Sequence, residues 1–139
     1  MTSHEQAQTP FKLPEFEDQD PVKLGREGYC HIALEVLLEL YPTGETYRLT
    51  NDHKGYDHVF LMLNGQPLDM CGRTSIAEMR TYYKVDSLVP EAASFQDIQK
   101  YFRGWETPEE KTRLKAYFKK HILDNLNLKF PPRETQTTN

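Results

Sequence analysis

Residues 58–72, His-Val-Phe-Leu-Met-Leu-Asn-Gly-Gln-Pro-Leu-Asp-Met-Cys-Gly, carry the strongest structural signal in the chain. The apolar run from His58 to Leu63 is typical of a buried strand. Asn64-Gly65 is the preferred sequence of a type I′ turn, which joins two strands of a hairpin. We therefore predict a hairpin whose second strand runs from Gln66 to Cys71 and ends at Gly72.

The two-residue turn also fixes which side chains of this hairpin share a face. It pairs residue 60 with 69 and residue 58 with 71, and side chains alternate between the faces of a strand. His58 and Phe60 are therefore expected on the same face as Asp69 and Cys71. Asp69 is a diagonal neighbour of His58 within side-chain reach. A carboxylate there can fix the tautomer of the imidazole and stabilise its charged form.

The segment before the hairpin predicts an amphipathic helix. It begins near Tyr29 and Cys30, after Gly28, and ends before Pro42. Its apolar positions recur at helical spacing and are Ile32, Ala33, Val36, Leu37 and Leu40.

Cys30 would lie at the N-terminus of this helix. The partial positive charge and unpaired N–H groups there favour a thiolate over a thiol. The same N–H groups could stabilise an oxyanion during acyl transfer. A helix packed on the face of His58 would bring the two side chains together. Cys30, His58 and Asp69 would then act as nucleophile, base and orienting carboxylate.

Each of these residues also has a plain structural interpretation. A free cysteine is often a small buried hydrophobe. A histidine at the start of a strand is commonly a surface residue, and Asp69 could simply lie at an edge. The three residue types in this order favour the catalytic interpretation.

At these residues the sequence resembles the papain-like and transglutaminase-like thiol fold. The resemblance covers residues 26–72 and rests on Gly28-Tyr-Cys-His-Ile-Ala-Leu, on the strand from His58, and on Leu68-Asp-Met-Cys-Gly72. It implies Cys30 as nucleophile, His58 as base and Asp69 as orienting residue.

The chemistry expected of these residues begins with a thioester. Peptide or isopeptide hydrolysis, deamidation and acyl transfer all share that intermediate, and the expected substrate is an amide bond of a protein or peptide. Tyr29, Phe60 and Cys71 adjoin the three residues and are predicted to contact the substrate.

The remainder of the chain predicts one further strand and three helices, and hence an α+β fold. Residues 47–50 are the strand candidate. Ser75 with Glu78 predicts a helix that ends at Tyr83, and Ser94 predicts a second helix toward Trp105. Thr107, Pro108 and Glu110 are the start signals of a last helix that continues to about Leu128.

Composition and charge predict one folded domain with a tail at each end. The 139 residues include 17 Lys and Arg against 21 Asp and Glu, for a formal charge of −4. We predict an extended or disordered acidic arm over residues 1–20, a single α+β domain over residues 21–130 and a disordered tail over residues 131–139. No signal peptide or membrane-spanning run is recognisable, so a cytoplasmic location is expected. No phosphate-binding loop is present, and no cofactor is expected.

Two other functions compete with the thiol enzyme. One is a non-catalytic protein-binding or inhibitor module on the same fold. The other is a zinc-binding structural domain, for which the candidate ligands are Cys30, His58, Asp69 and Cys71 with His31 or His53. The spacings of common zinc sites are absent, and no metal is predicted.

Two surface features complete the sequence analysis. Lys111, Lys115 and Lys119 form a basic face on the last helix, where an anionic partner could bind. His31 is assigned to solvent or to the helix start, because neighbouring residues on a helix do not face each other.

Overall fold

Along the described residues two helices precede four consecutive strands, and three helices and one more strand follow, which is the segregated order expected of an α+β protein. The structure is a computed structural model, and it describes residues 15–51 and 55–134. The helices are α2 (Pro21–Arg26), α3 (Cys30–Leu40), α4 (Ile76–Tyr83), α5 (Phe95–Tyr101) and α6 (Pro108–Leu123), after a short 3₁₀ helix, η2 (Phe16–Asp18). The strands are β1 (Glu45–Thr50), β2 (His58–Leu63), β3 (Gln66–Asp69), β4 (Gly72–Arg73) and β5 (Val89–Ala92). The predicted α+β class is confirmed.

The strands form one antiparallel sheet in the order β4-β3-β2-β1-β5. The hairpin is as predicted: Leu63 pairs with Gln66, and Asn64 and Gly65 have φ values of 51° and 80°, as a type I′ turn requires. The return strand is shorter than expected. It ends at Asp69, which pairs with Gly72 across a tight turn.

This early turn corrects the predicted position of Cys71. Cys71 lies in the turn and does not pair with His58. The cause is local, because the Asp69 carboxylate accepts the backbone N–H of Cys71 at 2.8 Å. Gly72 then begins β4, with a φ of 97° that favours glycine.

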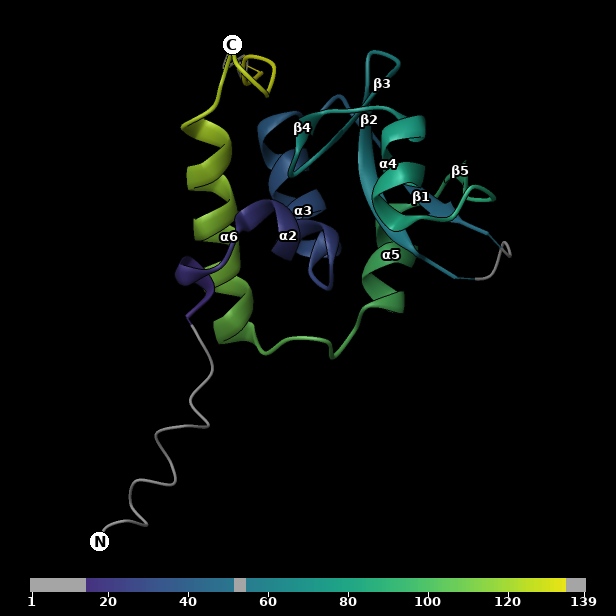
Figure 1. Cartoon of the computed structure of the whole chain (residues 1–139). Coiled ribbons are helices and arrows are strands. Elements are labelled where there is room, and N and C mark those ends of the chain that lie inside the picture. The colour runs from purple at the N-terminus through teal and green to yellow at the C-terminus, as the bar shows by residue number, and fades with distance from the viewer. Residues whose placement is uncertain (1–14, 52–54, 135–139) are drawn as a thin grey trace, which may run out of the picture.

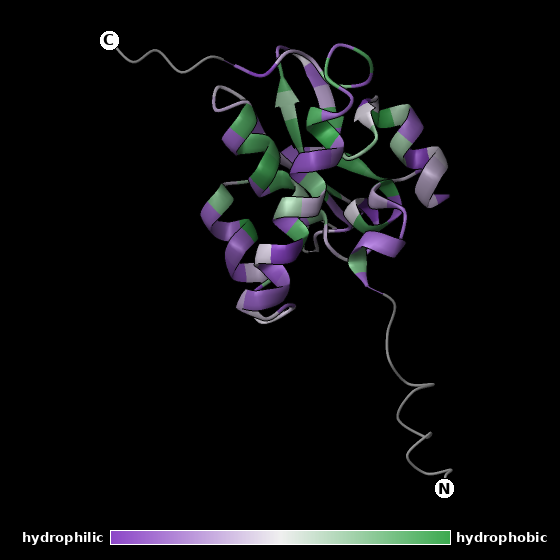
Figure 2. Cartoon of the chain, turned by 90° about the vertical axis from the view of Figure 1, so that its left-hand side faces the viewer, coloured by the Kyte–Doolittle hydropathy of each residue, from purple (hydrophilic) through white to green (hydrophobic). Residues whose placement is uncertain are grey.

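Two groups of apolar side chains cover the two faces of the sheet. Val59, Leu61 and Leu63 of β2 belong to the core shared with α3 and α6. Phe60 packs instead with Met79 of α4 in a second cluster. In Figure 1, α2, α3 and α6 group together to one side of the sheet, and α4 lies on the other. Figure 2 shows hydrophobic residues gathered where the elements face the centre.

The helix carrying Cys30 therefore packs on the face opposite to the one predicted. The side chain of His58 lies with Phe60 and with Tyr83 of α4, at ring centroid distances of 6.1 and 5.3 Å. α3 covers the Val59 face. Cys30 approaches His58 because it is the first residue of its helix and His58 is the first residue of β2.

The predicted starts of the C-terminal helices are confirmed, but two ends are wrong. Ser75, Ser94 and Thr107 each accept a backbone N–H as N-cap residues. α5 ends at Tyr101, before Trp105. α6 ends at Leu123, not near Leu128, and the chain then turns back so that Phe130 is fully buried.

Residues of the predicted arm and tail that the structure describes contact the domain. Phe16 packs edge-to-face on Tyr29, and the Tyr117 hydroxyl donates to the Gln19 carbonyl at 2.5 Å. The Tyr41 hydroxyl donates to the Pro131 carbonyl at 2.6 Å. Residues 1–14 and 135–139 of the predicted arm and tail lie outside the described residues. Over the described ranges, no helix has both the length and the apolar character needed to cross a membrane.

Candidate active site

The candidate residues meet at the end of the sheet where β2 begins and β3 ends. His58 is the first residue of β2 and Asp69 is the last residue of β3. Cys30 joins them from the N-terminus of α3. All three are buried, with 5% of Cys30 exposed and 2% or less of the other two.

Asp69 holds the imidazole of His58 in one orientation. His58 Nε2 lies 3.0 Å from Asp69 Oδ2. An ionised carboxylate can only accept hydrogen bonds, so Nε2 must carry the proton of this contact. The other ring nitrogen, Nδ1, is buried and makes no hydrogen bond of normal geometry to the described residues, although the ring interacts with Cys30. The ring therefore directs its second nitrogen away from Asp69.

Arg26 completes the environment of this carboxylate, and the sequence analysis did not find it. Its Nε donates to Asp69 Oδ2 at 2.8 Å, and a terminal nitrogen lies 3.3 Å from both Asp69 Oδ1 and the Thr74 hydroxyl. Burial acts to raise the pKa of Asp69, but His58 and Arg26 outweigh it and lower the pKa. Asp69 is thus a fixed anion. Arg26 is the last residue of the short helix α2. The sequence analysis did not predict this helix, because its residues show no apolar periodicity.

Cys30 has the acidity expected of a nucleophile. Burial alone would raise the pKa of its thiol. Hydrogen bonding to His31 and His58, the charge of His58 and the backbone N–H of Val59 outweigh burial and lower the pKa to about 6. The Tyr29 carbonyl accepts the N–H groups of Ile32 and Ala33, which closes the first turn of α3 behind Cys30.

His58 shows the complementary change. Burial disfavours its charged form, but hydrogen bonding to Asp69 and to Cys30 outweighs burial and raises the pKa of His58 to about 9. A thiolate on Cys30 beside an imidazolium on His58 is therefore the favoured pair between about pH 6 and pH 9.

A second histidine, His31, contacts Cys30, which corrects its assignment to solvent. His31 is 8% exposed, and its Nε2 lies 2.7 Å from Glu106 Oε1. Its ring stacks on Phe102 at 4.3 Å. The pKa values of Cys30 and His31 each include an interaction between the two side chains, so the two neighbouring residues act on each other despite their different helix faces.

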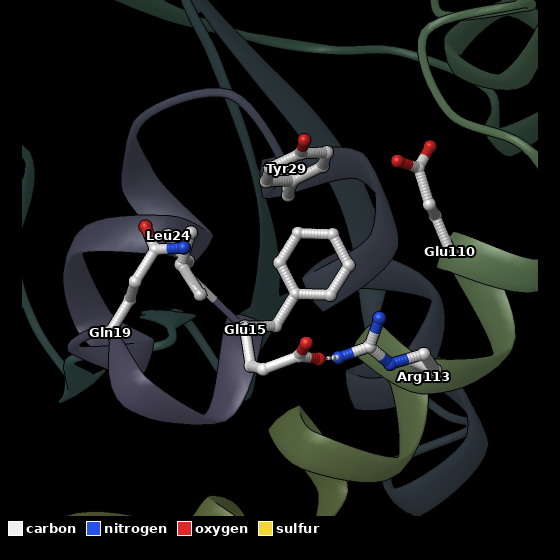
Figure 3. Close-up of a pocket in the computed structure, with 7 residues that line it drawn as sticks. Glu15, Gln19, Leu24, Tyr29, Glu110 and Arg113 are labelled. Carbon is white, nitrogen blue, oxygen red and sulfur yellow. Dashed lines mark hydrogen bonds and ion pairs between the residues drawn. The ribbon is translucent and has the colours of Figure 1, made fainter. Parts of the chain in front are cut away.

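Two pockets open beside the start of α3. Figure 3 shows the first, of about 380 Å³, with Tyr29, Leu24 and Glu110 in its walls and the Glu15–Arg113 ion pair at its edge. The second, of about 210 Å³, is lined by residues that include His31, Phe102 and Glu106. Cys30 lines neither of the two.

The three residues predicted to contact substrate have different surroundings. Tyr29 is partly buried and lines the first pocket. Cys71 is partly exposed in the turn after β3. Phe60 is fully buried beneath α4, because it points to the second apolar cluster. Phe60 therefore belongs to the core and lines no surface that a substrate could reach.

The predicted basic face of α6 is largely neutralised. Lys111 and Lys115 lie 3.0 and 2.9 Å from the Glu35 carboxylate of α3, and Lys115 also contacts Glu39. Lys119 is exposed. These ion pairs reduce the positive charge that this face presents to a partner.

The zinc hypothesis finds no cluster to support it within the described residues. There, no three His, Cys, Asp or Glu side chains are grouped so that they could hold a metal ion. His53, one of its candidate ligands, lies outside the described residues.

Comparison with known proteins returned no match to a family model, a curated protein or a solved structure.

Proposed function

We propose that the protein is a cysteine-dependent hydrolase or acyltransferase that acts on an amide bond of a protein or peptide. The observation that carries the proposal is the placement of His58, whose Nε2 is bound to Asp69 at 3.0 Å while Nδ1 is buried without a partner of normal geometry, on a ring that interacts with Cys30. The lowered pKa of Cys30 and the raised pKa of His58 support the same roles. The resemblance to the papain-like and transglutaminase-like fold over residues 26–72 remains part of this proposal.

In the proposed reaction, the Cys30 thiolate attacks the amide carbonyl and Sγ bonds to its carbon. The C–N bond then breaks, and the amine leaves with the proton that His58 carries on Nδ1. Water or a second amine next attacks the thioester and gives its proton to His58, and the thiolate leaves. First-turn N–H groups of α3 would stabilise the oxyanion. Hydrolysis, deamidation and acyl transfer differ only in the amine and the final acceptor.

A second candidate, a non-catalytic protein-binding or inhibitor module, is favoured by the burial of Cys30. Only 5% of this residue is exposed. Tyr83 of α4 also packs against His58, and its hydroxyl donates to the Arg26 carbonyl at 2.7 Å. A binding module needs no accessible thiolate, whereas an enzyme must admit its substrate to Cys30.

Acylation by p-nitrophenyl acetate separates the two candidates. The enzyme should release a burst of p-nitrophenolate that matches the protein concentration and should carry an acetyl group on the Cys30 peptide in mass spectrometry. C30A should abolish the burst, and E109Q, a change at an exposed position of α6, is the control that should retain it. No burst from the wild type, or a burst that persists in C30A, would contradict the proposed function.

A further inference from the structure

A second imidazole–carboxylate pair lies beside Cys30, formed by His31 and Glu106. The contact between His31 Nε2 and Glu106 Oε1 is 2.7 Å, and the two side chains are 9% and 13% exposed. The carboxylate must accept the Nε2 proton, as Asp69 does from His58. His31 Nδ1 is buried and makes no hydrogen bond to the described residues that satisfies the usual geometry.

The surroundings of His31 hold its ring in place. Phe102 stacks on it with an interplanar angle of 3°, and Trp105 packs against it edge-on at 6.0 Å. Glu106 directly precedes the N-cap of α6, where Thr107 and Glu110 form a complete capping box. The ring therefore has a fixed orientation, with Nε2 bound to Glu106 and Nδ1 buried without a partner of normal geometry.

We propose that His31, held and charged through Glu106, is a second positioning residue for the Cys30 thiolate. This inference rests on the proposed function, because a thiolate matters only if Cys30 is a nucleophile. Cys30 would lie between two imidazoles whose Nδ1–H groups both face sulfur. When the thiol ionises, its proton passes to Nδ1 of His58, and the thiolate accepts a hydrogen bond from each ring.

Charge balance supports this arrangement. With Cys30 ionised and both imidazoles protonated, three anions and three cations share a largely buried site, and burial penalises any unpaired charge. The anions are Cys30, Asp69 and Glu106, and the cations are His58, His31 and Arg26. With His31 neutral, Glu106 would leave the site with an unbalanced negative charge. The pKa of His31 is raised because Cys30 and Glu106 outweigh the effect of burial.

Other charged or titratable groups face this site from the surrounding elements. Glu35 of α3, Arg103 and Lys111 line the same pocket as His31. Glu35 is bound to Lys111 at 3.0 Å, so these two largely cancel. Tyr83 of α4 stays neutral, because burial and the negative charges of Cys30 and Asp69 raise its pKa. None of these groups replaces Glu106 as the direct partner of His31.

The test is the rate of Cys30 alkylation by iodoacetamide between pH 4.5 and pH 10, resolved by peptide mass spectrometry, in the wild type, E106Q and E109Q. The midpoint of this profile reports the acidity of the thiol, and the plateau at high pH reports its accessibility. E106Q retains the shape of the side chain but removes its charge. E109Q makes the same change of charge at an exposed position three residues away.

We expect E106Q to raise the midpoint by roughly half a unit or more, because a charged neighbour is lost, with the plateau unchanged. E109Q should match the wild type. A low wild-type midpoint that E106Q does not move would overturn the role proposed for His31 and Glu106 and leave the proposed function standing. An ordinary wild-type midpoint, near about 8.5, would overturn both.

Discussion

His58 and His31 are each bound to a carboxylate through Nε2, but in different surroundings. Each directs Nε2 to a carboxylate and leaves Nδ1 without a partner of suitable geometry. Asp69 is also bound by Arg26 and by the Cys71 N–H, and His58 is fully buried. Glu106 instead borders a pocket. The His58–Asp69 pair is therefore held by several buried hydrogen bonds. The carboxylate contact of His31 is the single one with Glu106, and one substitution can remove it.

The largest expected effect is on stability, and it separates the two pairs. R26M would leave Asp69 with His58 as its sole charged partner, and breaking a buried ion pair costs roughly 3–5 kcal/mol. K111M removes one of the two lysine partners of Glu35 beside the second pair and leaves Lys115 in place, and an exposed ion pair is worth about 0–1 kcal/mol. Urea unfolding of both variants measures the difference. Equal losses would contradict the claim that the first network is the rigid one.

The next effect is on the reactivity of Cys30. H58A removes a charge and a hydrogen bond, so the pKa of the thiol should rise from about 6 toward its ordinary value. The alkylation rate at pH 6 should then fall about a hundredfold. H31A removes the imidazole of the His31–Glu106 pair, which should affect the thiol less, and should lower the rate about tenfold. A larger fall in H31A than in H58A would reverse the assigned roles.

A third prediction concerns the pH range of the Cys30–His58 ion pair. D69N retains a hydrogen-bond acceptor but removes the charge that favours the imidazolium. The pKa of His58 should therefore fall from about 9 toward 6.5, which lowers the upper pH limit of the pair. An NMR titration of the His58 ring protons measures this change. E106Q is the matched control and should lower the pKa of His31 much more than that of His58.

The smallest expected effect tests how Glu106 is positioned. T107A removes the N-cap of α6 and should cost about 1 kcal/mol. It should also loosen Glu106 and lower the pKa of His31, without changing that of His58. S75A removes an equivalent cap from α4, at a similar cost. If both variants changed His31 equally, the effect would come from general loss of stability.

The same contrast explains which parts of the site the sequence could predict. The Asn64-Gly65 turn and the apolar stripe of α3 are local signals, and they placed Cys30 at a helix start and Asp69 near His58. Arg26 and Glu106 reach the site through α2 and the segment before α6, which no local pattern connects to it.

The predicted packing face of α3 was wrong because strand alternation cannot show which helix covers which face. Cys71 was misplaced because the Asp69 carboxylate closes a turn that the strand pattern hides.

The central claim is that Cys30 is a thiolate held by histidines, and its direct test is the pH dependence of iodoacetamide alkylation of the wild-type protein. Peptide mass spectrometry resolves Cys30 from Cys71, which serves as the internal comparison. The account predicts that Cys30 titrates near pH 6 and stays reactive in mild acid. A Cys30 that titrates near about pH 8.5, like an unperturbed thiol, or that remains unmodified while the protein is folded, would contradict it.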